Sequence, residues 1–304
     1  MNFLKGLALF ILNSLFFLSL AAFGTLFTLN NTLLNPDFVV AQVDRLDVTA
    51  LAREVTEGQI SGQLPPEVEF LEEAIYSTIA DNEPWLKEQV SAAVYSGYDY
   101  LLGKSERLSL TISLAPLKED LRDNLWQLFQ QNIQSLPPEV AAAPPGVLEQ
   151  YFDEFYQQFA EEIPSEFGVD ESSIPPEVMA QITQVRQYIS YAQTAYYALI
   201  GLMVLLVLGI ILLHRSVKGA TRELGIIILI YGALEYVSVW ATQNFLPTSL
   251  PLPDIPPSLQ SWLTGLIVDL VAPMQTLGIG LMVGGAALII VSIVYPRLRR
   301  VEEE

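Results

Sequence analysis

The sequence predicts a mainly α-helical integral membrane protein with four transmembrane helices and one mostly helical domain outside the membrane. Two observations lead to this prediction. The 304-residue chain has four apolar runs, each near or above the roughly 20 residues that cross a bilayer as a helix. Its excess of acidic residues is confined to the stretch between the first two runs. The runs lie at about 3–27, 195–213, 224–241 and 262–295.

The basic residues predict the orientation of these runs. Outside the acidic stretch the chain has only seven Lys or Arg, and each would lie in the cytoplasm if the N-terminus starts there. Positively charged flanks are retained on the cytoplasmic side during insertion. We therefore expect a multi-pass plasma-membrane protein with both termini cytoplasmic and the large domain extracytoplasmic. The seven residues are Lys5, Arg215, Lys218, Arg222, Arg297, Arg299 and Arg300.

These observations divide the chain into eight segments. The four expected transmembrane helices occupy 1–29, 193–213, 224–242 and 262–295, and the second continues a helix that starts at about 175. The acidic extracytoplasmic domain occupies 30–192, and a Pro-rich outer loop occupies 243–261. The cytoplasmic parts are the loop 214–223 and the tail 296–304.

The first apolar run has a second interpretation, a cleaved signal peptide. Its apolar part is longer than the 7–15 residues usual for the core of a signal peptide, and Ala21–Gly24 is the nearest candidate cleavage site. We therefore expect a retained anchor. Cleavage would leave the other three runs and the outer domain unchanged.

The acidity of the outer domain limits its partners. Residues 36–192 contain 27 Asp or Glu and 8 Lys or Arg, whereas the rest of the chain has seven of each, so this stretch accounts for the net charge of −19. Such a surface repels nucleic acid and bare anionic lipid. It is compatible with cations or cationic peptides, and solubility alone also explains it.

The inventory of catalytic residues is small. The chain has no Cys and one His, His214, at the inner end of the second run. Thiol chemistry and the usual zinc sites are therefore excluded, and a Ser-His-Asp triad would place its His across the membrane from the outer domain. Acid pairs such as Asp153–Glu154 are typical of solvated helix faces. We expect a non-enzymatic protein without a cofactor, with a carboxylate-based envelope enzyme as a lesser alternative.

Within the outer domain the pattern predicts five helices and a small β element. Residues 108–114 alternate strictly between apolar and polar side chains, which indicates a half-buried strand. The best pairing candidate is the stretch 165–170, so that the β element would join about 107–114 to 165–170. The helices are expected at about 37–56, 67–80, 83–102, 117–131 and 146–160.

Recurring proline pairs predict where helices begin. Pro-Pro-Glu-Val occurs three times, at Pro65–Val68, Pro137–Val140 and Pro175–Val178, and Ile255–Ser258 is a looser copy. Proline suits the first turn of a helix, and Glu suits its positive end. Asn35 before Pro36 similarly predicts an N-cap.

Two carboxyls in the last two runs form the candidate functional site. Counted from Thr242 and Trp262 as outer ends, Glu235 and Asp269 each lie about 11 Å deep at 1.5 Å per residue. We therefore expect antiparallel neighbours to bring them to one level. No Lys or Arg in either run can neutralise them. The site is either a proton or cation site or a pair of neutral, hydrogen-bonded acids. Its other predicted members are Tyr231, Ser238 and Thr276.

Other residues in the runs predict helix packing. Gly280 and Gly284 form a GxxxG motif, which lets two helices approach closely. We expect it to pack the bundle internally, with a homodimer as the alternative. Asn13, in the middle of the first run, is expected to hydrogen-bond to a neighbouring helix.

Several segments also carry a resemblance to a known group. They are Thr28–Val39, Glu83–Lys87, Tyr98–Gly103 and Lys218–Arg222. With them the chain resembles uncharacterised prokaryotic membrane proteins that have four spans and one large helical extracytoplasmic domain. The resemblance covers nearly the whole chain and implies no activity.

The sequence therefore favours a non-enzymatic membrane protein of the prokaryotic cell envelope. Its acidic domain would bind or sense a ligand or partner at the cell surface, or serve in an envelope complex. The alternative is an ion- or proton-linked transport or channel subunit that uses Glu235 and Asp269. The expected partners are the lipid bilayer, a membrane or surface protein, and a second copy of the chain, with no nucleic acid.

Overall fold

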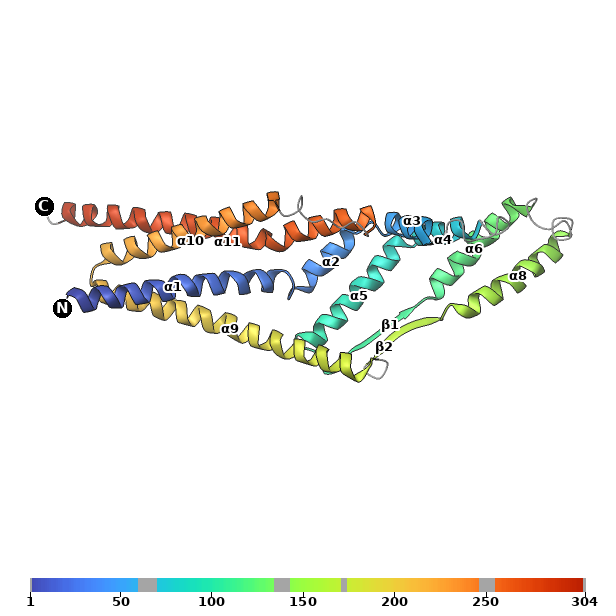
Figure 1. Ribbon diagram of the computed structural model, residues 1–304, viewed down its shortest axis with the longest axis horizontal. Coiled ribbons are helices and arrows are strands. Elements are labelled where there is room, and N and C mark those ends of the chain that lie inside the picture. Colours follow the sequence, from blue (N-terminus) through green and yellow to red (C-terminus); the bar gives the residue numbers. More distant parts are fainter. Residues whose placement is uncertain (1, 60–69, 134–142, 171–173, 246–254, 303–304) are drawn as a thin grey trace. The chain divides into compact units, whose positions relative to one another are not determined.

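The computed structural model describes residues 2–59, 70–133, 143–170, 174–245 and 255–302 (Figure 1). The chain divides into two units. The apolar unit contains Met1–Val39, Val185–Leu252 and Leu263–Glu304, and the acidic unit contains Val40–Gln184 and Pro253–Trp262.

The long helices of the structure match the four apolar runs. They are α1 (Asn2–Asn31), α9 (Pro176–His214), α10 (Val217–Phe245) and α11 (Pro257–Glu302). In the described part of the chain these four helices are long and apolar enough to cross a membrane, as predicted. Both α9 and α11 begin in the acidic unit and continue into the apolar unit.

The helix starts follow the proline and cap signals. Helix α9 begins at Pro176 with Glu177 in its first turn, so the copy Pro175–Val178 does start a helix. The copies at Pro65–Val68 and Pro137–Val140 lie outside the described residues. Asn35 also acts as predicted, because its Oδ1 accepts a hydrogen bond of 3.1 Å from the backbone N–H of Asp37 at the start of α2 (Pro36–Arg45).

The single helix predicted at 37–56 is wrong, because the structure has two. Helix α2 ends at Arg45, and α3 spans Val48–Gln59. Asp47 lies between them, and its carboxylate accepts a 2.8 Å hydrogen bond from the backbone N–H of Ala50. An aspartate in this position caps a new helix, so the break is built into the sequence.

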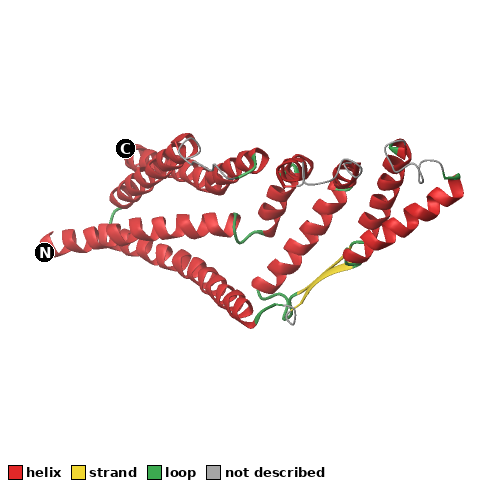
Figure 2. Cartoon of the chain, turned by 45° about the vertical axis from the view of Figure 1, so that its right-hand side comes forward, coloured by secondary structure: helices red, strands yellow, loops and turns green. Residues whose placement is uncertain are grey.

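The small β element is confirmed. Strand β1 (Ser109–Ser113) pairs antiparallel with β2 (Glu166–Asp170), with Thr111 opposite Gly168. The exposure of β1 alternates along its length, as the sequence pattern predicted. Figure 2 shows the two strands (yellow) as a short ribbon among helices.

The core of the acidic unit is aromatic. It lies between α4 (Phe70–Asp81), α6 (Ala115–Gln131) and α8 (Pro145–Glu162), whereas α5 (Glu83–Leu101) leads to the strands. The ring of Phe152 is fully buried, 4.9 Å from the ring of Trp126 and 5.6 Å from that of Phe129. The buried residues of this core are Ala74, Leu121, Leu125, Phe129 and Phe152.

Polar contacts reinforce the edge of this aromatic core. The guanidinium of Arg122 donates to the Asp153 carboxylate over 2.8 Å, and this bond raises the pKa of Arg122. The hydroxyl of Tyr156 donates to the backbone carbonyl of Lys118 over 2.6 Å. Burial raises the pKa of this Tyr156 phenol, so it stays a neutral donor.

The first turn of α11 is held by polar contacts inside the acidic unit. The Glu54 carboxylate of α3 accepts hydrogen bonds from the backbone N–H of Ser258, over 3.1 Å, and from its hydroxyl, over 2.7 Å. The indole N–H of Trp262 donates to the backbone carbonyl of Gln42, over 2.7 Å. A carboxylate at a helix N-terminus satisfies open N–H groups and complements the helix dipole.

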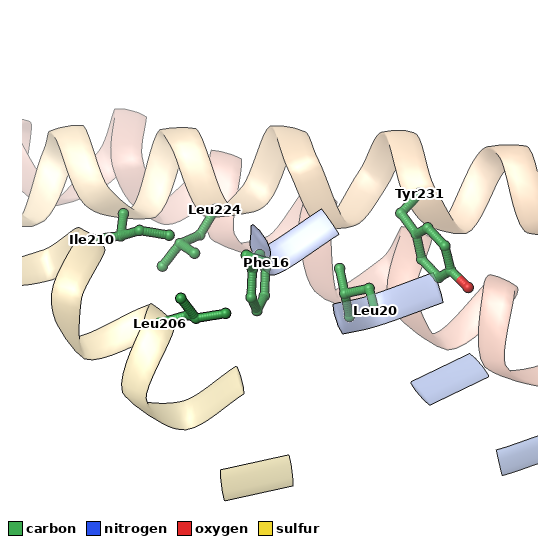
Figure 3. Close-up of a cluster of buried hydrophobic side chains, with 6 residues drawn as sticks. All are labelled: Phe16, Leu20, Leu206, Ile210, Leu224 and Tyr231. Atoms are coloured by element: carbon green, nitrogen blue, oxygen red, sulfur yellow. The ribbon is translucent and has the colours of Figure 1, made fainter. Parts of the chain in front are cut away.

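The apolar unit has a separate core. Its buried residues come from three helices and form a row (Figure 3). Tyr231 lies at one end of the row, and its hydroxyl points away from the rest of the cluster. The row consists of Phe16, Leu20, Leu206, Ile210, Leu224 and Tyr231.

Candidate functional site

The candidate site is built around the Glu235 carboxyl of α10. This side chain is only 4% exposed although it is ionisable. The hydroxyl of Tyr231, one helical turn earlier, donates to Oε1 of Glu235 over 3.2 Å. Oε2 is buried and has no hydrogen-bond partner among the described residues. The carboxyl therefore has one donor and no counter-charge in contact with it.

A glycine of α1 makes room for this carboxyl. A Cβ placed on Gly24 would lie 2.5 Å from the hydroxyl oxygen of Tyr231 and 2.6 Å from Oε1 of Glu235. The backbone carbonyl of Gly24 already accepts a 2.9 Å hydrogen bond from the Thr28 hydroxyl. Gly24 could not be predicted as part of the site, because a single glycine in an apolar run carries no specific signal.

Helices α10 and α11 pack through glycines on both sides. A Cβ on Gly232 would lie 2.7 Å from the Gly278 carbonyl oxygen, and one on Gly225 would lie 2.8 Å from that of Gly285. The two glycines of α10 are seven residues apart, and so are the two glycines of α11. Residues at this spacing lie on one face of a helix, two turns apart. Small residues at such positions let helix backbones approach closely. The earlier glycine of α10 contacts the later glycine of α11 and the reverse, so the two helices are antiparallel.

This register corrects the expected level of the two carboxyls. A Cβ on Gly278 would lie 3.6 Å from the Cβ of Glu235, so Gly278 lies at the level of Glu235. Asp269 is nine residues away from Gly278 along α11, or roughly 13 Å at the rise of a helix. The expectation failed because it assumed aligned helix ends, whereas the glycine contacts set the register.

The other predicted members of the site also separate. Ser238 and Thr276 are exposed, and the Thr276 hydroxyl donates to the carbonyl of Ala272 within its own helix, over 3.4 Å. Asp269 is half-buried. Of the five residues predicted to form the site, the structure brings Tyr231 and Glu235 together.

The predicted packing motif is corrected as well. A Cβ on Gly280 or Gly284 would meet no atom of the described residues within 4 Å, so this GxxxG does not pack against the described part of the bundle. Gly278 and Gly285 do so instead. The matching seven-residue spacing in two successive apolar runs was the signal that the sequence analysis missed. The alternative use of Gly280 and Gly284, in a homodimer, stays a prediction.

A second polar cluster joins three helices, and the sequence analysis did not assemble it. The imidazole Nε2 of His214, at the end of α9, lies 2.6 Å from Oε2 of Glu223 in α10. The Asn13 amide of α1 donates to the other oxygen of Glu223. Asn13 thus contacts a neighbouring helix, as its place in an apolar run predicts. His214 had been assigned only to the end of the span.

The two clusters differ in the chemistry they allow. Both carboxylate oxygens of Glu223 have polar partners, and its side chain is 28% exposed. Glu235 has one neutral donor, and no group of three or more His, Cys, Asp or Glu side chains that could hold a metal ion occurs in the described ranges. The arrangement at Glu235 is suited to a single carboxyl that binds or releases a proton.

No protein family, curated protein or solved structure matches this chain in the three comparisons with known proteins. The resemblance to uncharacterised four-span membrane proteins therefore stays a prediction.

Proposed function

We propose that the chain is a non-enzymatic plasma-membrane protein with four spans, both termini in the cytoplasm and the acidic unit outside. In this proposal the acidic unit binds or senses a ligand or partner at the cell surface, or joins an envelope complex. The helices that continue from the acidic unit into the spans carry the response.

The observation that most supports this proposal is the anchoring of α11. Glu54 binds the backbone N–H and the hydroxyl of Ser258, and Trp262 binds the carbonyl of Gln42. A ligand that moves α2 or α3 therefore acts on the first turn of α11. Further along, α11 packs against α10 through Gly278 and Gly285. Closely packed helices move together rather than deform, so a displacement at the first turn is passed to α10.

The charge of the acidic unit supports a cationic partner. Residues 36–192 carry a large acidic excess, whereas the remaining residues are balanced. A field of one sign steers oppositely charged ligands and repels like-charged ones. A basic peptide or the basic surface of another envelope protein fits this chemistry.

The orientation can be tested because the chain has no Cys. Single Cys substitutions at the exposed positions Glu106 and Lys218 would be treated in intact cells with a membrane-impermeant maleimide. We expect Glu106→Cys to be labelled at once and Lys218→Cys only after lysis. The reverse pattern would rule out the proposed topology.

The binding role can be tested by purifying the tagged chain from its native membrane in mild detergent. We expect a stoichiometric companion protein that is lost in the variant Phe152→Ala, because this change weakens the core of the acidic unit. Tyr151→Ala is the matched control, since Tyr151 is the exposed neighbour on the same helix. Recovery of the chain alone, or a companion that Phe152→Ala retains, would contradict binding through the acidic unit.

One observation favours a second candidate function, an ion- or proton-linked transport or channel subunit. Glu235 is buried among apolar helices, and one of its oxygens has no hydrogen-bond partner in the described ranges. Ionisable residues within spans commonly mark ion or proton pathways. This function predicts that reconstituted vesicles show a flux of ions or protons across the membrane, and that Glu235→Gln abolishes it. An equal flux in both proteins would eliminate the role of this carboxyl.

A further inference from the structure

We propose that Glu235 is a proton-binding site that holds its carboxyl in the neutral acid form, with Tyr231 as its hydrogen-bond donor and Gly24 as the residue that leaves it room. The inference uses the membrane placement proposed above, but it does not depend on surface binding or on transport. It names the proton, rather than a metal cation, as the ligand of this carboxyl.

The Glu235 carboxyl is deeply buried but has few hydrogen-bond partners. Glu235 is 4% exposed, and its one hydrogen bond comes from a neutral phenol. An ionised carboxylate removed from water costs several kcal/mol unless charges or several donors compensate for it. The acid form needs less compensation. Its carbonyl oxygen accepts the Tyr231 hydrogen bond, and its second oxygen carries the proton.

The second argument is the charge of the surrounding helices. There is no Lys or Arg anywhere between Leu224 and Tyr295, and α1 has only Lys5, far from Gly24 in the sequence. Gly24 of α1 and Gly278 of α11 both lie close to Glu235, and neither has a side chain that could carry charge. Tyr231 is the titratable group in contact with it on α10. Among the described residues, no Lys or Arg forms an ion pair with Glu235 that could hold its carboxylate form.

The third argument concerns metal cations. Calcium takes six to eight oxygen ligands, and magnesium requires an octahedral set. Among the described residues, the Tyr231 hydroxyl is the side-chain group bonded to the Glu235 carboxyl, and no group of three or more His, Cys, Asp or Glu side chains that could hold a metal ion occurs. This set is too small for such an ion, whereas a proton needs only one oxygen.

The fit of α1 explains why the acid is enclosed. A methyl group on Gly24 would overlap both the Tyr231 hydroxyl and Oε1 of Glu235. Gly24→Ala should therefore displace the carboxyl or push α1 away and let water reach it. Gly6 of α1 is the matched position, because a Cβ there meets nothing within 4 Å.

The proposal can be tested by infrared spectroscopy of the purified full chain at neutral pH. A protonated carboxyl has a C=O stretching band above the amide region, and a carboxylate lacks it. We expect this band in the difference spectrum between the unaltered chain and Glu235→Gln. The same difference should appear in an Asp269→Asn background, because the two carboxyls lie at different levels.

A second variant tests the environment of the acid. Tyr231→Phe removes the hydroxyl that donates to Oε1, so the acid band should move to higher frequency as its carbonyl loses a hydrogen bond. Gly24→Ala should weaken or abolish the acid band at neutral pH, whereas Gly6→Ala should leave it unchanged. Circular dichroism and gel filtration verify that each variant keeps its helices and its oligomeric state.

Two results would overturn the proposal. One is a difference spectrum that shows carboxylate bands in place of the acid band at neutral pH. The other is an acid band that appears only after sodium and potassium are replaced by a bulky organic cation, which would make Glu235 a metal-cation site. Since the measurement needs no partner, no flux and no particular orientation, its failure is distinguishable from failure of the proposed function.

Discussion

The acidic unit and the apolar unit differ in the kind of packing that stabilises each of them internally. The acidic unit has a core of interlocking aromatic rings around Phe152, reinforced by polar contacts at its edge. In the apolar unit, α10 and α11 meet backbone to backbone at Gly225, Gly232, Gly278 and Gly285. In water, burying large apolar side chains is itself the driving force. In lipid that gain is absent, and close contact between helices replaces it. This difference in packing agrees with the proposal that the apolar unit lies in the membrane and the acidic unit lies outside it.

The largest effect is expected when the aromatic core is opened. Phe152→Ala removes a fully buried ring that contacts Trp126, Phe129 and Tyr156. We expect the acidic unit to lose about 3–5 kcal/mol of unfolding free energy, the usual cost of such a cavity. Thermal unfolding followed by Trp fluorescence measures the loss, because Trp126 belongs to the same core.

The control for this prediction lies one residue away. Tyr151 is 49% exposed, so Tyr151→Ala should change the unfolding free energy by less than about 1 kcal/mol. Equal effects of the two substitutions would show that the ring cluster does not hold the unit together.

A smaller effect is expected from filling a glycine contact between α10 and α11. A Cβ on Gly232 would lie 2.7 Å from the Gly278 carbonyl oxygen and 2.8 Å from the Met282 nitrogen. Since backbone atoms cannot move aside like a flexible side chain, Gly232→Ala should destabilise the bundle by about 1–3 kcal/mol. Resistance to unfolding by a denaturing detergent measures this change.

Gly280→Ala provides the opposite case on α11. In the part of the chain that the structure describes, nothing lies within 4 Å of a Cβ at this position, and alanine favours a helix over glycine. The bundle should therefore be unchanged or more stable. If Gly280→Ala were as damaging as Gly232→Ala, Gly280 would have to pack against something other than this chain, and the predicted homodimer would be the first explanation to test.

Local signals predicted most of the fold correctly. The alternation at 108–114 predicted β1, because a half-buried strand places apolar and polar side chains in turn. The segment 165–170, chosen as its best pairing candidate, contains β2. Pro175–Val178 identified the start of α9, and the apolar runs identified the four long helices. The failure at 37–56 was also local. The predicted helix ran straight through Asp47, whereas this residue caps α3.

The candidate site was harder to predict, because it depends on the register between helices. Sequence spacing identified Tyr231 and Glu235 as neighbours, since they lie on one helix. It did not identify Gly24, nor the separation of Glu235 from Asp269, because both follow from which glycines touch. The cluster of Asn13, Glu223 and His214 was missed for the same reason. Its members come from three helices, and no single segment shows the pattern.

The contact between Glu54 and α11 should contribute less to the unfolding free energy than the aromatic core or the glycine contacts do. Glu54→Ala removes the acceptor of the Ser258 backbone N–H and hydroxyl. Loss of a helix cap costs about 0.5–2 kcal/mol. Hydrogen exchange at the first turn of α11 should therefore rise, while the aromatic core of the acidic unit keeps its protection. Glu106→Gln, at an exposed position, is the control. Unchanged exchange in Glu54→Ala would remove the main support for transmission through α11.

The smallest predicted effect is the one that depends on pH. Glu83 of α5 forms an ion pair with Lys87 over 2.8 Å and accepts a hydrogen bond from the Thr49 hydroxyl of α3. The hydrogen bond from Lys87, followed by that from Thr49, lowers the pKa of Glu83 below its ordinary value of 4.5, although burial opposes the shift. A lowered pKa means that the folded state favours the ionised carboxylate. Its contribution is therefore complete above about pH 4.5 and is lost as the pH falls through the folded pKa.

Glu83→Gln should accordingly destabilise the acidic unit by about 0.5–1 kcal/mol at pH 7, the size of a partly exposed ion pair, and by progressively less below pH 4.5. Thermal unfolding of the unaltered chain and of Glu83→Gln, from pH 7 to below pH 4.5, gives the difference in unfolding free energy at each pH. The contributions of the other acids of the unit cancel in this difference. Glu88→Gln, exposed on the same helix, is the control and should change the unfolding free energy at pH 7 by less than about 0.5 kcal/mol. A difference for Glu83→Gln that grows on acidification would have the wrong sign for a stabilised carboxylate. It would mean that the contacts with Lys87 and Thr49 do not favour the ionised carboxylate of Glu83 in the folded protein.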